Sequence, residues 1–321
     1  MNVRRLIPTT AVAGAVTLGL ITLSACSGTS DAADKGSGDK LDVVASFYPM
    51  QFLAEQIGGT YVTVNTLTKP GVEPHDLELK PKQVGELGDA DVVLYLKGIQ
   101  PAVDDAIAQS NAGTTIDAAT LTKLEEHGTE VGHDHGAEEA GHDHGSEAGA
   151  DPHIWLDPVK YGEVAQGVGA AFEKADPTHA AAYKANTQAL MTKLAALNSE
   201  FENGLKNTAT KTFITTHSAF GYLAERYGLE QEGITGIDPE AEPSPARVKE
   251  LQEIAKKDKV STVFFETLAS DRTAKTLATD TGLKTDVLDP LEGITDKSKG
   301  DDYIEVMRSN LAALQKALGA K

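Results

Sequence analysis

The run Leu41-Asp-Val-Val-Ala-Ser46 is short, apolar and typical of a β-strand, and a helical pattern follows it through Ile57 to the glycine pair 58–59. Tyr61 to Leu67 is again strand-like. Asp91-Val-Val-Leu-Tyr-Leu96 has the continuous apolar character of a strand that is buried on both faces. Strands that alternate with helices in this way predict parallel βαβ units.

The same alternation returns after Lys211. Further strands are predicted at 212–216, 233–237, 260–265 and 285–288, and further helices at 218–227, at 246–257 and from about residue 271. Glu73-Pro-His and Glu242-Pro-Ser precede comparable strands in the two halves, which indicates a weak internal repeat. We therefore expect an α/β fold with two similar βα lobes, each built on a parallel sheet.

A helical region separates the two halves. Residues 178–206 are rich in Ala, Leu, Lys, Gln and Glu, and apolar residues recur there at steps of three and four. A helix of this length spans about 40 Å, which is enough to cross from one lobe to the other. We expect an N-terminal lobe at 41–158, linking helices at 159–208 with one long rigid helix, and a C-terminal lobe at 209–321.

The first 25 residues have the pattern of a secretory signal peptide, with Arg4 and Arg5 before an apolar stretch. Cys26 is the single cysteine of the chain, and it follows Leu-Ser-Ala in a pattern that resembles a bacterial lipobox. We expect diacylation of Cys26 and a lipid anchor on the outer side of the cell membrane. The alternative is an ordinary signal peptide with an incidental cysteine. Residues 26–40 contain almost only small and polar residues, which predicts a flexible tether.

Composition excludes several classes of function. The chain has 321 residues with 29 basic and 48 acidic side chains, which gives a formal net charge of −19 and argues against nucleic acid as a partner. A single cysteine excludes both a disulfide framework and a cysteine-based metal site. Metal chemistry in this chain must therefore use histidine and carboxylate ligands.

The acidic segment 125–150 contains five of the nine histidines and no Lys or Arg; the five are His127, His133, His135, His142 and His144. Such a segment cannot form a hydrophobic core. Imidazoles beside carboxylates are suitable ligands for borderline divalent metals, so we expect weak, auxiliary metal capture here. The alternative is a solvated linker.

Three other histidines lie in turns between structured segments. They are His75, His153 and His217, which come from both halves of the chain. Loops at the carboxyl ends of parallel strands are where open α/β sheets bind ligands. Asp289 ends the last predicted strand, and Glu266 is its competitor as a fourth ligand. Three imidazoles and one carboxylate suit a tetrahedral zinc site.

With these motifs the sequence resembles the metal-binding (cluster A-I) solute-binding lipoproteins of ABC transporters, within them the zinc receptor subgroup (ZnuA-like). The motifs that carry the resemblance are Glu73-Pro-His75-Asp, Asp151-Pro-His153-Ile-Trp-Leu-Asp-Pro158, Thr215-Thr-His217-Ser-Ala-Phe-Gly-Tyr222 and Asp286-Val-Leu-Asp289-Pro. The resemblance implies two lobes joined by a long helix, and a zinc ion in the cleft held by His75, His153, His217 and Asp289, with Glu266 as the alternative fourth ligand.

The resemblance also implies a monomer that hands zinc to an ABC permease and its ATPase and that is not an enzyme. Histidine at position 217 favours zinc, because manganese receptors of this family tend to carry a carboxylate there. The alternatives are a manganese or iron receptor of the same family and, from other classes, a secreted zinc hydrolase or an adhesin. No His-Glu-x-x-His motif occurs in the sequence, which argues against the hydrolase.

Overall fold

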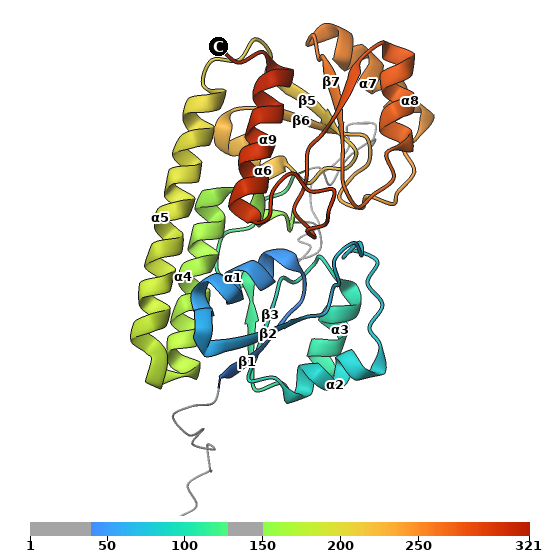
Figure 1. Cartoon of the computed structure of the whole chain (residues 1–321). Coiled ribbons are helices and arrows are strands. Elements are labelled where there is room, and N and C mark those ends of the chain that lie inside the picture. Colours follow the sequence, from blue (N-terminus) through green and yellow to red (C-terminus); the bar gives the residue numbers. More distant parts are fainter. Residues whose placement is uncertain (1–39, 128–149) are drawn as a thin grey trace, which may run out of the picture. The chain divides into compact units, whose positions relative to one another are not determined.

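The computed structural model describes residues 40–127 and 150–321 (Figure 1). The expected signal peptide, Cys26, almost all of the tether and the histidines at 133, 135, 142 and 144 lie outside these residues. The described part contains two parallel four-stranded sheets with the same strand order, β2-β1-β3-β4 and β6-β5-β7-β8. The prediction of an α/β fold with two similar lobes is therefore confirmed.

The first sheet consists of β1 (Leu41–Ala45), β2 (Val62–Thr66), β3 (Val92–Tyr95) and β4 (Thr114–Asp117), and its lobe contains α1 (Tyr48–Gly58), α2 (Pro81–Asp89) and α3 (Pro101–Gln109). The second sheet consists of β5 (Thr212–Thr215), β6 (Glu230–Gly233), β7 (Thr262–Phe265) and β8 (Lys284–Val287), and its lobe contains α6 (Gly221–Tyr227), α7 (Pro245–Lys257), α8 (Arg272–Thr281) and α9 (Tyr303–Leu318).

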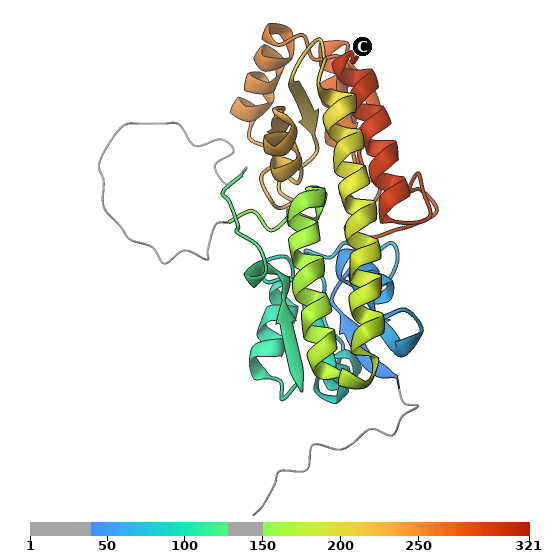
Figure 2. The same cartoon turned by 90° about the vertical axis from the view of Figure 1, so that its left-hand side faces the viewer.

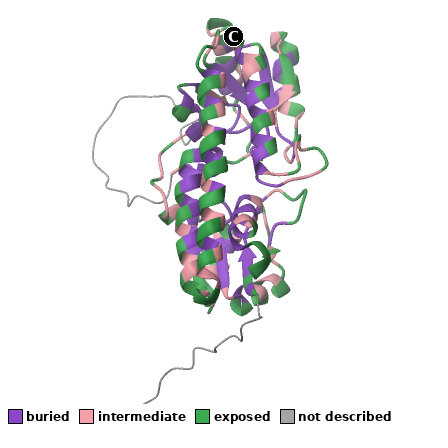
Figure 3. Ribbon diagram, turned by 60° about the vertical axis from the view of Figure 1, so that its left-hand side comes forward, coloured by how far each residue is buried: buried purple, intermediate pink, exposed green. Residues whose placement is uncertain are grey.

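Two helices, α4 (Pro158–Ala175) and α5 (Ala180–Leu205), connect the lobes. Figure 2 shows them side by side in front of the first lobe, with α5 continuing along the second lobe beside α9. The 26 residues of α5 extend over roughly 39 Å. One side of α5 faces the protein interior with residues such as Leu190, Leu194 and Phe201, while other positions along it are exposed (Figure 3). The expected long helix is thus present.

Alternate residues of the central strands enter different parts of the hydrophobic core, as the twofold period of a strand requires. In β1, Val43 packs into a large core that also contains Phe201 of α5, whereas Val44 packs under α2 and α3. In β5, Phe213 belongs to the same large core, and Ile214 packs instead under α7 and α8. One continuous core therefore joins the inner faces of both sheets, which fixes the strand ends of the two lobes relative to each other.

Most predicted elements lie within a few residues of their expected positions, but one strand is shifted. The strand expected at Gly233 to Ile237 is β6, Glu230–Gly233. Its residues Glu-Gln-Glu-Gly are polar because β6 is an edge strand, where charged side chains prevent pairing with other chains. The helix α3 and the edge strand β4 were not predicted. Among the described residues no helix combines the length and the apolar character needed to span a bilayer.

Candidate metal centre

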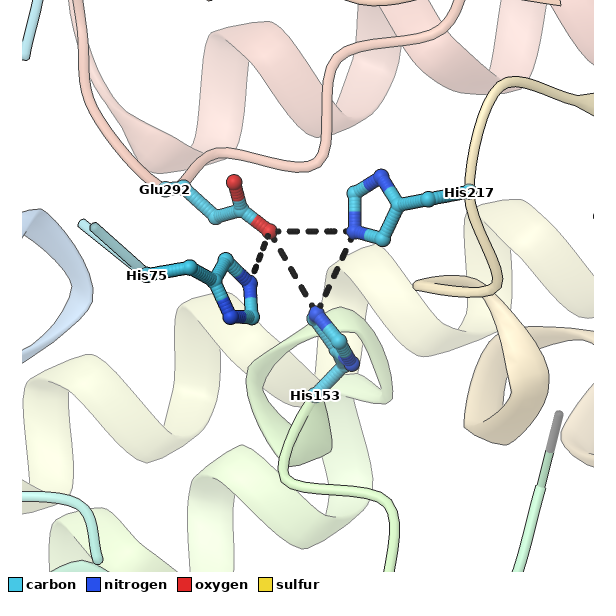
Figure 4. Close-up of side chains that lie close together, drawn as sticks. All are labelled: His75, His153, His217 and Glu292. Carbon is cyan, nitrogen blue, oxygen red and sulfur yellow. Dashed lines mark hydrogen bonds and ion pairs between the residues drawn. The ribbon is translucent and has the colours of Figure 1, made fainter. Parts of the chain in front are cut away.

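Three imidazoles and one carboxylate point toward a common centre between the two lobes (Figure 4). They belong to His75, His153, His217 and Glu292, and one potential ligand atom from each lies within 4.8 Å of all the others. Oε1 of Glu292 lies 3.4 Å from Nε2 of His75 and 3.3 Å from Nε2 of each of the other two histidines. The Nε2 atoms of His153 and His217 are 3.4 Å apart.

The fold brings these four residues together from segments far apart in the sequence. His75 lies in the loop between β2 and α2, and His153 precedes a short 3₁₀ turn, Ile154–Leu156. His217 follows the end of β5 by two residues, and Glu292 follows the end of β8 by five. Loops that follow parallel strands meet at one edge of their sheet, so two lobes facing each other form a ligand site from such loops.

Two of the imidazoles are held by carboxylates on their far side. Asp151 Oδ1 lies 2.7 Å from Nδ1 of His153 and also accepts the backbone N–H of that residue at 2.9 Å. Glu266 Oε1 lies 2.6 Å from Nδ1 of His217. A proton on each Nδ1, donated to its carboxylate, leaves the lone pair on Nε2, which faces the centre. This is the arrangement of histidines that ligate metals.

The pairing of His217 with Glu266 follows from sheet topology. β5 and β7 are hydrogen-bonded neighbours, and His217 and Glu266 lie just beyond their carboxyl ends. Both side chains are almost completely buried, with 0% and 2% exposure. The contact could not be derived from spacing along the chain, because 49 residues separate the two partners.

Charge and burial compete at the centre. Burial alone would lower the pKa of His217, but the Glu266 and Glu292 carboxylates outweigh it and hold that pKa well above the usual value. Burial alone would raise the pKa of Glu292, but the charge of His217 and the other imidazoles hold it well below the usual value. Burial and the Glu292 carboxylate raise the pKa of Glu73 to about 9, so this neighbouring carboxyl group is neutral at pH 7.

The separations around Oε1 of Glu292, and that between His153 and His217, fit a small tetrahedral ion. Zinc–nitrogen and zinc–oxygen bonds of about 2.0–2.1 Å place two tetrahedral ligand atoms about 3.3–3.4 Å apart. The four separations given above, 3.3 Å and 3.4 Å, match this spacing. Nε2 of His75 and both carboxylate oxygens of Glu292 are buried and make no regular hydrogen bond within residues 40–127 and 150–321. Buried polar atoms without a partner are costly, which favours an ion as their partner.

Neither carboxylate expected as the fourth ligand belongs to this group. Asp289 directs its oxygens to the hydroxyls of Ser298 and Thr267 and to the backbone N–H of Leu291. Glu266 contacts the outer nitrogen of His217, as described above. We therefore replace both by Glu292 in the proposal below. Glu292 lies three residues after Asp289 and is not among the candidate ligands that the sequence predicts.

One histidine of the acidic segment reaches the surroundings of the centre. Nδ1 of His127 lies 3.2 Å from Asp151 Oδ2, and its Nε2 lies 3.1 Å from Glu225 Oε2. Asp151 thus connects His127 to His153 without bringing His127 among the four converging residues. The role of the five histidines in auxiliary metal capture stays a prediction.

The chain matches the family model described as zinc-uptake complex component A, periplasmic (ZnuA), over residues 43–317. It is similar to the high-affinity zinc uptake system protein ZnuA of Bacillus subtilis (strain 168), with 37% identity over 317 residues, 94% of this chain and 98% of that protein. It is also 37% identical to the zinc-binding lipoprotein AdcA of Streptococcus pneumoniae serotype 4 over 88% of this chain but only 56% of AdcA. The chain thus spans little more than half the length of AdcA.

Solved structures agree with this assignment. The Zn(II)-bound ZnuA-like domain of Streptococcus pneumoniae AdcA is 34% identical, with a TM-score of 0.71 over 87% of this chain and 99% of that one. The laminin-binding protein Lmb of Streptococcus agalactiae, described as bifunctional with adhesin and metal transporting activity, is 31% identical, with a TM-score of 0.76 over 87% of this chain and 100% of that one. Because the family model covers residues 43–317 and the fold is shared, the chain belongs to the zinc-uptake complex component A (ZnuA) family.

Proposed function

We propose that this chain is an extracytoplasmic zinc receptor that binds Zn²⁺ through His75, His153, His217 and Glu292 and delivers it to an ABC-type importer. The observation that carries the proposal is the convergence of three Nε2 atoms and one carboxylate oxygen within 4.8 Å of one another, with the oxygen 3.3–3.4 Å from each nitrogen. Zinc is here the transported substrate, and it is not a resident cofactor.

The ligand set favours zinc over manganese or iron as the substrate. Imidazole nitrogen suits zinc, whereas manganese prefers sites made mainly of carboxylate, carbonyl and water oxygens. Three of the four converging ligands are imidazoles. Their spacing also matches the tetrahedral geometry that zinc adopts in closed protein sites. The names of the relatives in Bacillus subtilis and Streptococcus pneumoniae, which refer to zinc uptake and zinc binding, support the same substrate.

The set of four protein ligands favours a zinc carrier over a zinc enzyme. A catalytic zinc ion usually has three protein ligands and keeps a fourth position for water or substrate. Here a fourth protein ligand, Glu292, fills that position, and its side chain has 0% exposure. A closed and buried site binds an ion tightly but offers no room for a second reactant, as a carrier requires.

The expected location and partners are part of the same proposal. The lipobox-like Leu23-Ser-Ala-Cys26 supports cleavage before Cys26 and anchoring by acyl chains on the outer side of the membrane. A membrane permease and its ATPase would take up the released zinc; the name of the Bacillus subtilis relative, a zinc uptake system protein, supports a role in uptake. A receptor that docks on a permease can act as a monomer, because both lobes of the site belong to one chain.

Metal analysis and a pair of histidine variants test this function. We expect one zinc per chain after purification without chelator, measured by elemental analysis. In competition titrations with a chromophoric chelator, His217→Ala should lower zinc affinity by more than the roughly 10- to 100-fold that is typical of losing a residue that only orients a ligand. His179→Ala is the matched control, because this histidine pairs with Asp176 away from the site.

Several outcomes would contradict the proposal. Equal zinc affinity of the parent and His217→Ala would exclude the site, and manganese or iron in place of zinc would favour the alternative receptor. For delivery, deletion of the gene in its host should raise the zinc concentration needed for growth. The parent gene should restore growth in low zinc and the His217→Ala gene should not. If both genes restore growth in low zinc, zinc uptake does not depend on the proposed site.

A further inference from the structure

Glu292 differs from His153 and His217 because, within the described residues, no hydrogen bond holds its carboxylate from behind. Asp151 and Glu266 orient two of the imidazoles, whereas both oxygens of Glu292 are buried without a regular hydrogen bond in the described part of the chain. The side chain of Glu292 therefore depends on its own backbone for its position.

The backbone directly before Glu292 has an unusual conformation. Leu291 has a φ of +59°, which lies in the left-handed region that residues with a Cβ atom adopt at a cost in free energy. Its side chain is completely buried in the large core that joins the lobes. A strained residue persists only where its surroundings determine it, and it tends to lie beside functional sites. The strain is thus located next to the proposed fourth ligand.

Asp289 supplies one part of these surroundings. Its Oδ1 accepts the backbone N–H of Leu291 at 2.8 Å, which closes a turn around Pro290. Its Oδ2 accepts hydrogen bonds from the hydroxyls of Ser298 at 2.8 Å and Thr267 at 3.2 Å. The side chain of Asp289 thus joins both ends of the Glu292 loop to the segment that follows β7.

Asn310 on α9 fixes the backbone of Asp289 from the other side. The side-chain oxygen of Asn310 accepts the N–H of Asp289 at 2.9 Å, and its side-chain nitrogen donates to the C=O of Asp289 at 2.7 Å. Asn310 is 2% exposed, so water competes little for these bonds. The Glu292 loop is therefore attached to a helix of the second lobe at the residue where it begins.

Trp155 connects the same loop to the His153 segment. Its indole N–H donates to the C=O of Pro290 at 2.7 Å, and its own C=O accepts the hydroxyl of Tyr303 at 2.6 Å. Trp155 lies two residues after His153, and Pro290 lies two residues before Glu292. The peptide segments that carry these two ligands are thus hydrogen-bonded to each other.

Resting on the zinc site proposed above, we propose that Asp289 and Asn310 are positioning residues that hold Leu291 in its left-handed conformation and thereby present the Glu292 carboxylate to the metal. Asp289 contributes to zinc affinity through Glu292 and not as a ligand. A carboxylate that is already in place needs no ordering when zinc binds, which raises affinity.

Substitutions of Asp289 in the full chain test this role. Asp289→Ala removes the acceptor for the Leu291 N–H, and we expect zinc affinity to fall about 10- to 100-fold, as for other residues that orient ligands. Asp289→Asn keeps that acceptor, so its zinc affinity should lie within about threefold of that of the parent, a much smaller loss than for Asp289→Ala. Asp296→Ala is the matched control, since this exposed aspartate lies on the same loop.

Cobalt substitution distinguishes positioning of a ligand from general damage to the fold. Four-coordinate Co²⁺ absorbs more strongly in the visible range than Co²⁺ with more ligands, so the spectrum reports the geometry of the site. The Co²⁺ spectrum of Asp289→Ala should resemble that of Glu292→Gln. In the Glu292→Gln background, Asp289→Ala should cause no further loss of zinc affinity, because the two residues act together.

The outcomes separate this inference from the proposed function. A parent chain that binds no zinc would reject the function itself. If the parent binds zinc and Asp289→Ala has the parental zinc affinity and Co²⁺ spectrum, only the positioning role is rejected. The same holds if Asp289→Ala causes its full loss of zinc affinity also in the Glu292→Gln background. If Asp289→Ala does not fold, Asp289→Ser retains an acceptor for Leu291 but loses the bonds to Ser298 and Thr267. Asp289→Ser should then lose less zinc affinity than is expected for Asp289→Ala, but its Co²⁺ spectrum should change in the same way. Parental zinc affinity and a parental Co²⁺ spectrum for Asp289→Ser would also reject the positioning role.

Discussion

At His217 and Glu292, two of the proposed ligands, protons would compete with zinc for the same atoms. In the metal-free protein, burial would disfavour charge on either group, yet their mutual attraction raises the pKa of His217 and lowers that of Glu292. Burial alone would lower the pKa of His153, but the Asp151 and Glu292 carboxylates together outweigh it and raise that pKa. Zinc requires the unprotonated imidazole, so binding must release protons.

Zinc affinity should therefore decrease already at a pH above the usual histidine pKa of about 6.5. The raised pKa values of His153 and His217 mean that protons occupy these nitrogens at higher pH than in an isolated histidine. Competition titrations between pH 8.5 and 5.5 measure this dependence. An affinity that stays constant down to pH 6.5 would contradict proton competition at the two buried imidazoles.

Stability should depend on pH differently in the metal-free and the zinc-loaded form. In the metal-free protein the raised pKa of His217 contributes stability below about pH 6.5, and this contribution is lost as the pH rises through the folded-state value. The zinc-loaded protein carries no such proton, so this decrease in stability should be absent from it. Melting temperatures with and without zinc from pH 6 to 9 test the difference, and parallel trends would contradict it.

At the level of helices, Arg226 connects α6 of the second lobe to the start of α4. Its guanidinium donates twice to Asp157 Oδ2, at 2.8 Å and 2.7 Å, and the other oxygen of Asp157 caps α4 by accepting the N–H of Val159. The Asp157 side chain is 1% exposed and that of Arg226 is 35% exposed. A buried carboxylate is costly without its partner, so this contact should matter more than an ion pair at the surface.

Arg226→Ala should lower the free energy of unfolding by about 1.5–3 kcal/mol, the range for hydrogen bonds that involve charged groups. Arg308→Ala is the control, because Arg308 makes a similar pair of bonds to Glu200 between α9 and α5. That pair is 51% and 38% exposed, and its loss should cost less than about 1 kcal/mol. Urea denaturation of the metal-free variants measures both, and equal losses would contradict the distinction by burial.

For the whole molecule, the acidic histidine segment is attached at both of its ends. The backbone N–H of Asp151 donates to the C=O of Glu125 at 2.8 Å. The hydroxyl of Tyr222 accepts the N–H of Glu125 at 2.7 Å and donates to the C=O of Asp151 at 2.8 Å. None of these bonds involves residues 128–149, so that segment can be replaced without removing them.

Replacing residues 128–149 by a short Gly-Ser linker should leave the proposed tight zinc site intact and abolish the binding of additional, weakly held zinc ions. The four proposed ligands all belong to the described residues, whereas four of the five histidines predicted to capture metal weakly are removed. Isothermal titration with zinc gives both stoichiometry and affinity. If the number of weakly bound zinc ions stays the same, the segment has no role in metal capture. If the affinity of the tight site decreases, the segment takes part in that site.

The sequence alone determined the architecture and three of the four proposed ligands. The alternation of strands and helices depends on local periodicity, which the chain carries in runs such as 41–46 and 91–96. His75, His153 and His217 were recognisable because each lies in a turn beside a structured segment. The polar edge strand β6 was misplaced and β4 was missed, because edge strands lack the apolar pattern of central ones.

Only the tertiary structure determined which acid joins the histidines. Asp289 and Glu292 lie in one loop, and their directions depend on the left-handed Leu291, on Asn310 of α9 and on the indole of Trp155. Asp151 and Glu266 likewise become partners of the imidazoles through contacts in the folded chain. Periodicity is a property of neighbouring residues, whereas the direction of a side chain in a loop depends on atoms that folding brings in from distant segments.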